Sequence, residues 1–164
     1  MKTLILFTLI VFSQLIYGQS QPKVSFIFLQ DQTEGEIENV NVDMKLDWNN
    51  LSQSKIIGIA DVSSLNTGNK MRDKHLKSND YFDVAQYPKM RFECLSFEKK
   101  GDKYRAIGKL MIKSITNEVE FLVEVIDGSL IWWATIDTAD FDIRVKKGEG
   151  KNKVKVRVEV PLSK

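Results

Sequence analysis

Arg72, Asp73 and His75 are the side chains whose types and spacing could carry chemistry, because they lie together in one short polar segment. A histidine can act as an acid, a base or a zinc ligand, and His75 is the only histidine in the chain. A zinc site needs three or four nitrogen, sulfur or carboxylate ligands, and no cluster with that spacing lies nearby. A serine triad needs a histidine held between two partners, which this spacing does not establish. We therefore predict a structural role, with no catalytic residue and no metal site.

The segment that carries these residues is expected to form a short helix. Asn69 is a suitable N-cap, and Lys70–Lys77 can form about two helical turns. So short a helix is not stable alone and must pack on something, with Leu76 and Met71 as the expected apolar anchors. We expect His75 to be a buried neutral imidazole that anchors the segment through hydrogen bonds and ring packing.

The residues after this helix are expected to return the chain to a strand. A second turn is predicted near Ser78 or Asp80, driving Tyr81 and Phe82 inward, and Pro88 ends the excursion. Arg72 and Asp73 are adjacent, so we expect them to face different directions and to pair with other elements. We interpret the whole segment as a cap. Its predicted cap residues are Arg72, Asp73, His75, Leu76, Tyr81 and Phe82.

The sequence around the cap alternates with period two, which is typical of β-strands with one buried face. In the run Lys153–Leu162 four valines share one face, and Lys155, Arg157 and Glu159 share the other. The same pattern predicts further strands. They are Val24–Leu29, Asp43–Trp48, Ile56–Val62, Met90–Phe97, Tyr104–Lys113, Glu118–Val125 and Leu130–Ile143. Eight or nine antiparallel strands form either a closed barrel or a two-sheet sandwich, and periodicity alone does not choose between them.

Residues 1–18 are typical of a signal peptide, with Lys2 ahead of an apolar stretch too short to span a bilayer comfortably. Cleavage is expected after residue 18 or 20, so that residues 19–164 form a single exported domain, periplasmic or secreted, with no membrane span. The chain has 24 basic and 22 acidic side chains, a balance that argues against a nucleic-acid partner. Cys94 is the only cysteine and is interpreted as a buried small hydrophobe.

The cap segment resembles the central signature of the YceI-like family, periplasmic barrel proteins associated with binding polyisoprenoid lipids. The resemblance is carried by residues in register with the signature. They are Thr67, Gly68, Asn69, Arg72, Asp73, His75, Leu76, Ser78, Asp80, Tyr81, Phe82, Asp83, Tyr87 and Pro88. It continues through Gly108–Thr116 and through Asp140 and Phe141, so it covers essentially the whole mature chain. The chain departs from the family pattern in a shortened first strand, in Val42 and in Ser114.

This resemblance implies an all-β fold, an extended lipocalin-like antiparallel β-barrel of about eight strands with a short helical insertion at about residues 69–86. It also implies a non-enzymatic protein that sequesters or carries an isoprenoid lipid, polyprenyl or quinone-type, as a ligand rather than a cofactor. Another long-chain lipid is compatible with the same barrel, and so is a homodimer. The alternative is a non-catalytic structural or stress-related protein whose barrel is filled by its own side chains and which binds a protein partner.

A barrel of this size can hold one small ligand if its inward side chains leave room. We predict an apolar interior in which small residues leave space for the ligand. The alternative is that these small residues merely relieve crowding where the sheet coils. The predicted ligand-binding interior comprises Met44, Leu46, Ile56, Gly58, Ala60, Phe92, Ala106, Gly108, Leu110, Phe121, Val123, Trp132, Ala134, Ile136, Val156 and Val158.

Overall fold

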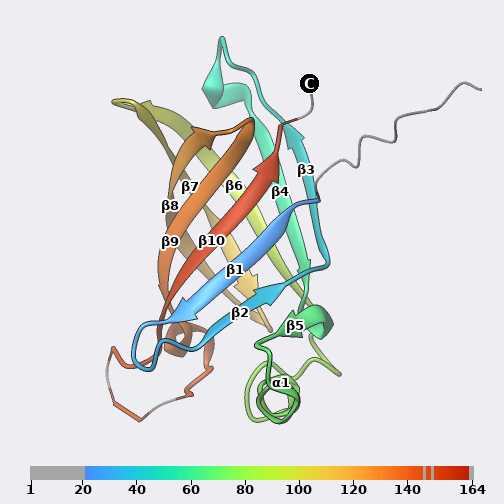
Figure 1. The fold of residues 1–164 in the computed structure, drawn as a ribbon. Helices are drawn as coiled ribbons and strands as arrows, with labels where there is room; N and C mark the ends of the chain where they lie inside the picture. Colours follow the sequence, from blue (N-terminus) through green and yellow to red (C-terminus); the bar gives the residue numbers. More distant parts are fainter. Residues whose placement is uncertain (1–20, 146, 149, 163–164) are drawn as a thin grey trace, which may run out of the picture.

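The computed structural model describes residues 21–145, 147–148 and 150–162, so the predicted signal peptide lies outside the described residues. Its strands form one antiparallel sheet that curls into a barrel (Figure 1). The strands are β1 (Lys23–Phe28), β2 (Glu34–Ile37), β3 (Val40–Lys45), β4 (Lys55–Asp61), β5 (Leu65–Asn66), β6 (Lys89–Lys100), β7 (Lys103–Ile112), β8 (Ile115–Ile126), β9 (Ser129–Asp137) and β10 (Lys153–Pro161). The helical elements are η1 (Leu51–Gln53), η2 (Val62–Ser64), α1 (Lys70–Lys77) and η3 (Thr138–Phe141).

The order of the strands in the sheet is β3-β4-β6-β7-β8-β9-β10-β1-β2-β5. The edge strands of the sheet are β3 and β5, and they do not pair with each other. The barrel is therefore completed by the connections between strands as well as by the hydrogen bonds of the sheet. The corner between β2 and β3 is tied to the end of β4 by a hydrogen bond from Asp61 N–H to the Asn39 carbonyl, 2.8 Å. The expected barrel is therefore confirmed, with a sheet of ten strands rather than about eight.

The additional strands are short, which explains why the alternation did not predict them. β2 has four residues and carries Glu34 and Glu36, and β5 has two residues. One predicted strand is also too long, because β9 ends at Asp137 rather than at Ile143. The Asp137 carboxylate accepts a hydrogen bond from the Ala139 N–H, 3.0 Å, and so caps η3. A competing side-chain cap therefore ends the strand there.

Strand β10 shows how alternation builds the barrel. Val154 and Val160 are buried, Val156 and Val158 are half-buried, and all four face the interior. Strand β9 pairs with β10 so that Ala134 lies opposite Val156 and Trp132 opposite Val158. The turn from β8 to β9 has positive φ at both Asp127 (48°) and Gly128 (76°), as a tight hairpin requires.

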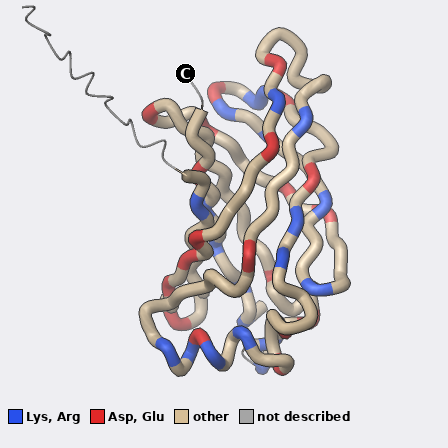
Figure 2. The backbone as a smooth tube through the Cα atoms, turned by 90° about the vertical axis from the view of Figure 1, so that its right-hand side faces the viewer, with Lys and Arg blue, Asp and Glu red and all other residues tan. Residues whose placement is uncertain are grey.

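The outer face of the barrel is polar. Basic and acidic residues are interspersed along the strands rather than gathered in one patch (Figure 2). Arg105 on β7 donates to Glu120 on β8 at 2.9 Å and to Glu98 on β6 at 3.1 Å. The hydrogen bond from Arg105 lowers the pKa of Glu120. None of the helices described is long and apolar enough to cross a membrane.

The predicted helix is confirmed at Lys70–Lys77. The Asn69 side chain accepts from the N–H groups of Met71 and Arg72, 3.1 Å each, as an N-cap does. Helix α1 lies at one end of the barrel, beside β5 (Figure 1). Residues 67–88, which include this helix and lead into β6, form the cap segment.

Candidate ligand-binding cavity

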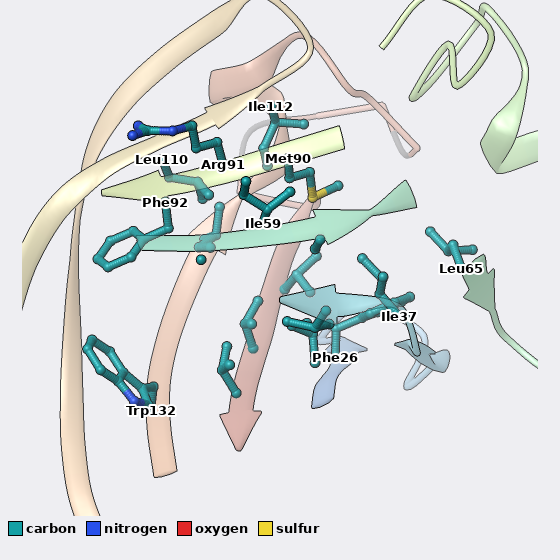
Figure 3. Close-up of a pocket in the computed structure, with 18 of the residues that line it drawn as sticks. Phe26, Ile37, Ile59, Leu65, Met90, Arg91, Phe92, Leu110, Ile112 and Trp132 are labelled. Atoms are coloured by element: carbon teal, nitrogen blue, oxygen red, sulfur yellow. The ribbon is translucent and has the colours of Figure 1, made fainter. Parts of the chain in front are cut away.

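The inner face of the curled sheet lines a cavity of about 160 Å³ whose walls are almost entirely apolar. Strands from all around the sheet contribute to it, including β1, β3, β4, β6, β7, β9 and β10. Figure 3 shows Trp132 and Phe92 at one end of the labelled lining residues and Ile37 and Leu65 toward the other. A preformed apolar cavity under a cap can desolvate a hydrocarbon chain.

Most of the interior residues predicted from the sequence line this cavity. Those that do are Ile56, Gly58, Ala60, Phe92, Leu110, Phe121, Trp132, Ile136, Val156 and Val158. Their contact with a ligand stays a prediction, but their place around one apolar space follows from the strand register. Gly58, for example, pairs with Val42 on one side and with Phe92 on the other.

Six predicted interior residues do not line the cavity. They are Met44, Leu46, Ala106, Gly108, Val123 and Ala134. Ala106 and Val123 have no exposed surface, because aromatic rings and neighbouring strands cover them. Met44 and Leu46 pack against the core beyond the cavity. These residues occupy the barrel interior, but our expectation that each borders open space is corrected by the packing.

Gly58 and Gly108 show why alternation in the sequence could not separate the interior residues that line the cavity from those that do not. A Cβ built on Gly58 would meet nothing within 4 Å. A Cβ on Gly108 would lie 2.5 Å from the Glu93 carbonyl oxygen and 2.5 Å from the Phe92 ring. Our assignment of Gly108 to the cavity wall is therefore wrong, because the Phe92 ring occupies the space that this glycine leaves.

Gly108→Ala is consequently expected to destabilise the fold by about 1–3 kcal/mol, because the backbone of β6 cannot easily move away from the new methyl group. Gly58→Ala is the matched control and should leave the free energy of unfolding unchanged or slightly raised. Chemical denaturation of both variants measures the difference. Equal stabilities for the two alanine variants would contradict the assigned packing.

Aromatic rings pack together at one end of the cavity. Phe92, Phe121 and Trp132 are in mutual contact, with ring centroids 5.2–6.1 Å apart. Phe97 stacks between Trp132 (5.9 Å) and Tyr104 (5.4 Å). These contacts close one end of the cavity with a packed aromatic wall.

The cap segment closes the other end through two apolar side chains. Leu76 and Phe82 are 5% and 7% exposed, and both line the cavity. Tyr81 is half-buried and packs against the same core. Met71, which we expected to be an anchor, is 84% exposed. Helix α1 therefore presents the face of Leu76 to the barrel and leaves Met71 in solvent.

Arg72 and Asp73 hold the base of the cap segment through one threonine. The Asp73 carboxylate accepts from the Thr67 hydroxyl (2.6 Å) and from the Thr67 N–H (2.9 Å). The Arg72 guanidinium donates to the Thr67 hydroxyl (2.8 Å) and carbonyl (2.9 Å). We expected these neighbours to face different directions and to pair with other elements. Both do pair outside α1, but they reach the same residue, Thr67, so the expectation of different directions is wrong.

His75 is exposed, which corrects our expectation of a buried imidazole. Its ring makes an edge contact with Tyr81, with ring centroids 4.8 Å apart. Water reaches the exposed ring, so the imidazole N–H needs no hydrogen-bond partner within the protein. Its contribution to anchoring comes from the ring contact.

Thr67→Val should lower the free energy of unfolding by about 1–2 kcal/mol, because it removes a hydroxyl that serves a carboxylate and a guanidinium while keeping the side-chain shape. His75→Ala is the comparison within the cap segment and should cost less than about 1 kcal/mol. Thermal or denaturant unfolding of both variants tests this order. A larger loss for His75→Ala would show that the imidazole anchors the segment.

The cavity also includes residues that we did not predict. Among them are Val24, Phe26 and Phe28 on β1, and Val40 and Val42 on β3. The alternation of β1 was visible in the sequence, but its assignment to the inner face needed the pairing of Val24 with Val158. Leu65 and Ile37 lacked a signal, because their strands are too short to show a period.

Charged groups stay outside the cavity. Arg91 borders it, but its guanidinium points away (Figure 3) and donates to Glu93 at 2.6 Å, which lowers the pKa of Glu93. Cys94 is half-buried, and burial raises the pKa of its thiol to about 11. Within the described ranges no three His, Cys, Asp or Glu residues cluster closely enough to hold a metal ion. The chemistry available inside the barrel is therefore apolar contact with very few polar groups.

The chain is similar in sequence to known proteins. A family model described as the YceI-like domain matches residues 18–163. A UPF0312 protein of Photorhabdus laumondii is 32% identical over 85 residues, which is 52% of this chain and 44% of that protein. A UPF0312 protein of Staphylococcus aureus is 37% identical over 93 residues, which is 57% of this chain and 52% of that protein. The chain thus spans about half the length of the curated relatives it matches.

Solved structures share the fold. BcnA of Burkholderia cenocepacia has a TM-score of 0.76 at 24% identity, covering 85% of this chain and 94% of that chain. A Campylobacter jejuni YCEI protein has a TM-score of 0.69 at 22% identity, covering 78% and 82%. A polyisoprenoid binding domain from Saccharophagus degradans has a TM-score of 0.58 at 11% identity, covering 85% and 91%. At these identities the likeness is one of fold.

Proposed function

The chain belongs to the YceI-like domain family, and from that premise we propose that it binds an isoprenoid lipid, polyprenyl or quinone-type, inside its barrel. In this proposal the protein sequesters or carries the lipid and has no catalytic step and no cofactor. The bound lipid is its ligand, and the barrel shields the ligand's hydrocarbon chain from water.

The observation that carries the proposal is the apolar cavity under the cap segment. Its walls consist of aliphatic and aromatic side chains, and its volume is about 160 Å³. Each CH₂ group moved from water into such a space contributes about 0.8 kcal/mol, so a hydrocarbon chain can bind through its tail alone. The branched methyl groups of an isoprenoid match a wall that combines open positions, such as Gly58, with packed rings, such as Phe92.

Fold likeness supports the same ligand class. The Saccharophagus degradans domain is described as a polyisoprenoid binding domain, and its chain folds as this one does. The alternative, a structural protein with a filled barrel, requires side chains to occupy the interior. Gly58 and the cavity beside it favour the lipid-binding role.

We also propose that the protein acts outside the cytoplasm. Residues 1–18 would be a signal peptide removed after residue 18 or 20, and residues 19–164 would form the single exported domain. The apolar composition of residues 4–16 supports this proposal.

Native mass spectrometry of protein purified from the exported fraction, with organic extraction of the same sample, tests the proposed function. We expect a co-purified prenyl lipid at close to one molecule per chain. The control is the same protein after delipidation and incubation with vesicles that contain a polyprenol or a quinone with a prenyl tail, which should restore the complex. A barrel that is empty after purification and remains empty after incubation would refute lipid carriage.

A further inference from the structure

The cavity is small compared with a long isoprenoid chain. Its volume is about 160 Å³. An engineered protein cavity of about 150 Å³, with a similar lining of aliphatic and aromatic side chains, holds one benzene molecule. The cavity of this protein therefore has room for about six carbon atoms, which is close to one five-carbon isoprene unit. A polyprenyl or quinone tail contains several such units, so only part of the tail fits beside these walls.

One end of the cavity is closed by packed aromatic rings. Phe92 lines the cavity, and its ring contacts the rings of Phe121 and Trp132, with centroids 5.2 and 6.1 Å away. Phe97 does not line the cavity, is 3% exposed and stacks on the Trp132 ring. In Figure 3 Phe92 and Trp132 lie on the opposite side of the labelled residues from Leu65. A chain that enters the cavity therefore ends at these rings.

The Phe92 ring is fixed in position by its neighbours. Gly108 on β7 lies beside it, and a Cβ on this glycine would come within 2.5 Å of two ring carbons. The ring thus fills the space that Gly108 leaves, and the rings of Phe121 and Trp132 pack on it as well. In a core packed to this density, the Phe92 ring cannot move aside for a longer chain.

The closed end suits the hydrocarbon terminus of a lipid rather than its head. Thr138 and Arg91 border the cavity but direct their polar groups elsewhere. The Thr138 hydroxyl donates to the Ile143 carbonyl at 2.7 Å, and the Arg91 guanidinium points outward to Glu93. A polar head buried against the aromatic rings would lose its hydrogen bonds to water without replacement. The end of the tail therefore faces Phe92, and the head lies away from it.

We propose that Phe92 is the stop that sets how much of the isoprenoid tail this protein holds. The end of the tail rests against the Phe92 ring, about one isoprene unit lies in the cavity, and the remaining units and the head extend away from the aromatic rings. This inference rests on the proposed function and specifies which part of the ligand is recognised. Affinity should then depend on the terminal units of the tail and not on its total length.

The test measures dissociation constants for prenol, geraniol, farnesol and geranylgeraniol, a series in which isoprene units are added one by one to the same uncharged alcohol. In wild-type protein the affinity should rise from prenol to geraniol and then change less than about threefold up to geranylgeraniol. Phe92→Ala removes a ring of about the volume of one isoprene unit and joins its space to the cavity. In this variant farnesol should bind at least about tenfold more tightly than geraniol, so that the plateau begins one unit later.

Phe97→Ala is the matched control. Phe97 lies on the same strand as Phe92 and loses the same ring, but it does not line the cavity. This variant should lose stability as Phe92→Ala does, while its plateau should begin at geraniol as in the wild type. If either alanine variant fails to fold, Phe92→Leu and Phe97→Leu repeat the comparison with a smaller change. The preference for farnesol over geraniol should then rise in Phe92→Leu alone.

A wild-type affinity that keeps rising about tenfold with each unit up to geranylgeraniol would overturn the stop and leave lipid binding intact. An unchanged plateau in a folded Phe92 variant, or the same shift in the matching Phe97 variant, would also overturn it. Failure of all four alcohols to bind the wild type would refute the proposed function together with this inference. The two failures are therefore distinguishable.

Discussion

Gly58→Phe is expected to reduce isoprenoid uptake more than tenfold while the protein remains folded. A Cβ at this position meets nothing within 4 Å, and the side chain would extend into the cavity between Val42 and Phe92. Displacing two CH₂ groups of a ligand removes about 1.6 kcal/mol of transfer energy, which corresponds to more than a tenfold loss of affinity. Binding of a prenyl probe by titration, with circular dichroism as the check of folding, measures the effect.

Asn41→Phe is the control for this substitution. Asn41 is exposed on β3 and pairs with Ile59, one position along β4 from Gly58, so the same ring is added on the outer face. Its uptake should match that of the wild type. Full uptake by a folded Gly58→Phe variant would place the ligand outside the cavity. Gly58→Leu offers a smaller filling side chain if overpacking by phenylalanine destabilises the barrel.

Phe82→Ala is expected to lower the free energy of unfolding by about 3–5 kcal/mol and to accelerate release of the bound lipid. Phe82 is 7% exposed and closes the cavity at the cap segment, so its removal leaves a void that joins the cavity. Water can then reach the lipid, and the cap segment loses one of its two apolar anchors. Denaturant unfolding measures the stability, and transfer of a fluorescent prenyl lipid to acceptor vesicles measures the release rate.

Met71→Ala is the control within the same segment. Met71 is 84% exposed, so its truncation should change the stability by less than about 0.5 kcal/mol and leave the release rate unchanged. Similar effects of the two substitutions would mean that the cap segment does not close the barrel through Phe82. A stable Phe82→Ala variant with unaltered release would have the same meaning.

The cap segment shows which structural features neighbouring residues in the sequence determine. Asn69 and the residues that follow it specified the helix at Lys70–Lys77, because N-capping and propensity act within a few residues. N-capping and propensity did not determine which face of that helix packs against the barrel. A helix of two turns is too short for its apolar pattern to define one stripe, so Met71 and Leu76 were equally good candidates. Packing against the barrel buried Leu76 and left Met71 and His75 exposed.

The sequence by itself determined the all-β class, the long strands and the identity of the capping segment, because period-two alternation and capping are local properties. The order of the cap residues also determined the family resemblance. The short strands β2 and β5 could not be predicted from alternation, since they owe their strand conformation to pairing with β1 and with each other rather than to any pattern of their own.

The tertiary structure alone decided which inward residues border empty space. Gly58 and Gly108 lie on the two strands that flank β6 and both face the interior, so alternation treats them alike. The Phe92 ring occupies the space beside Gly108, whereas the space beside Gly58 is empty. The direction of one aromatic side chain depends on the rings of Phe121 and Trp132 packed against it, which come from distant strands. A cavity is what remains after all such contacts are made, and it is therefore a property of the folded barrel.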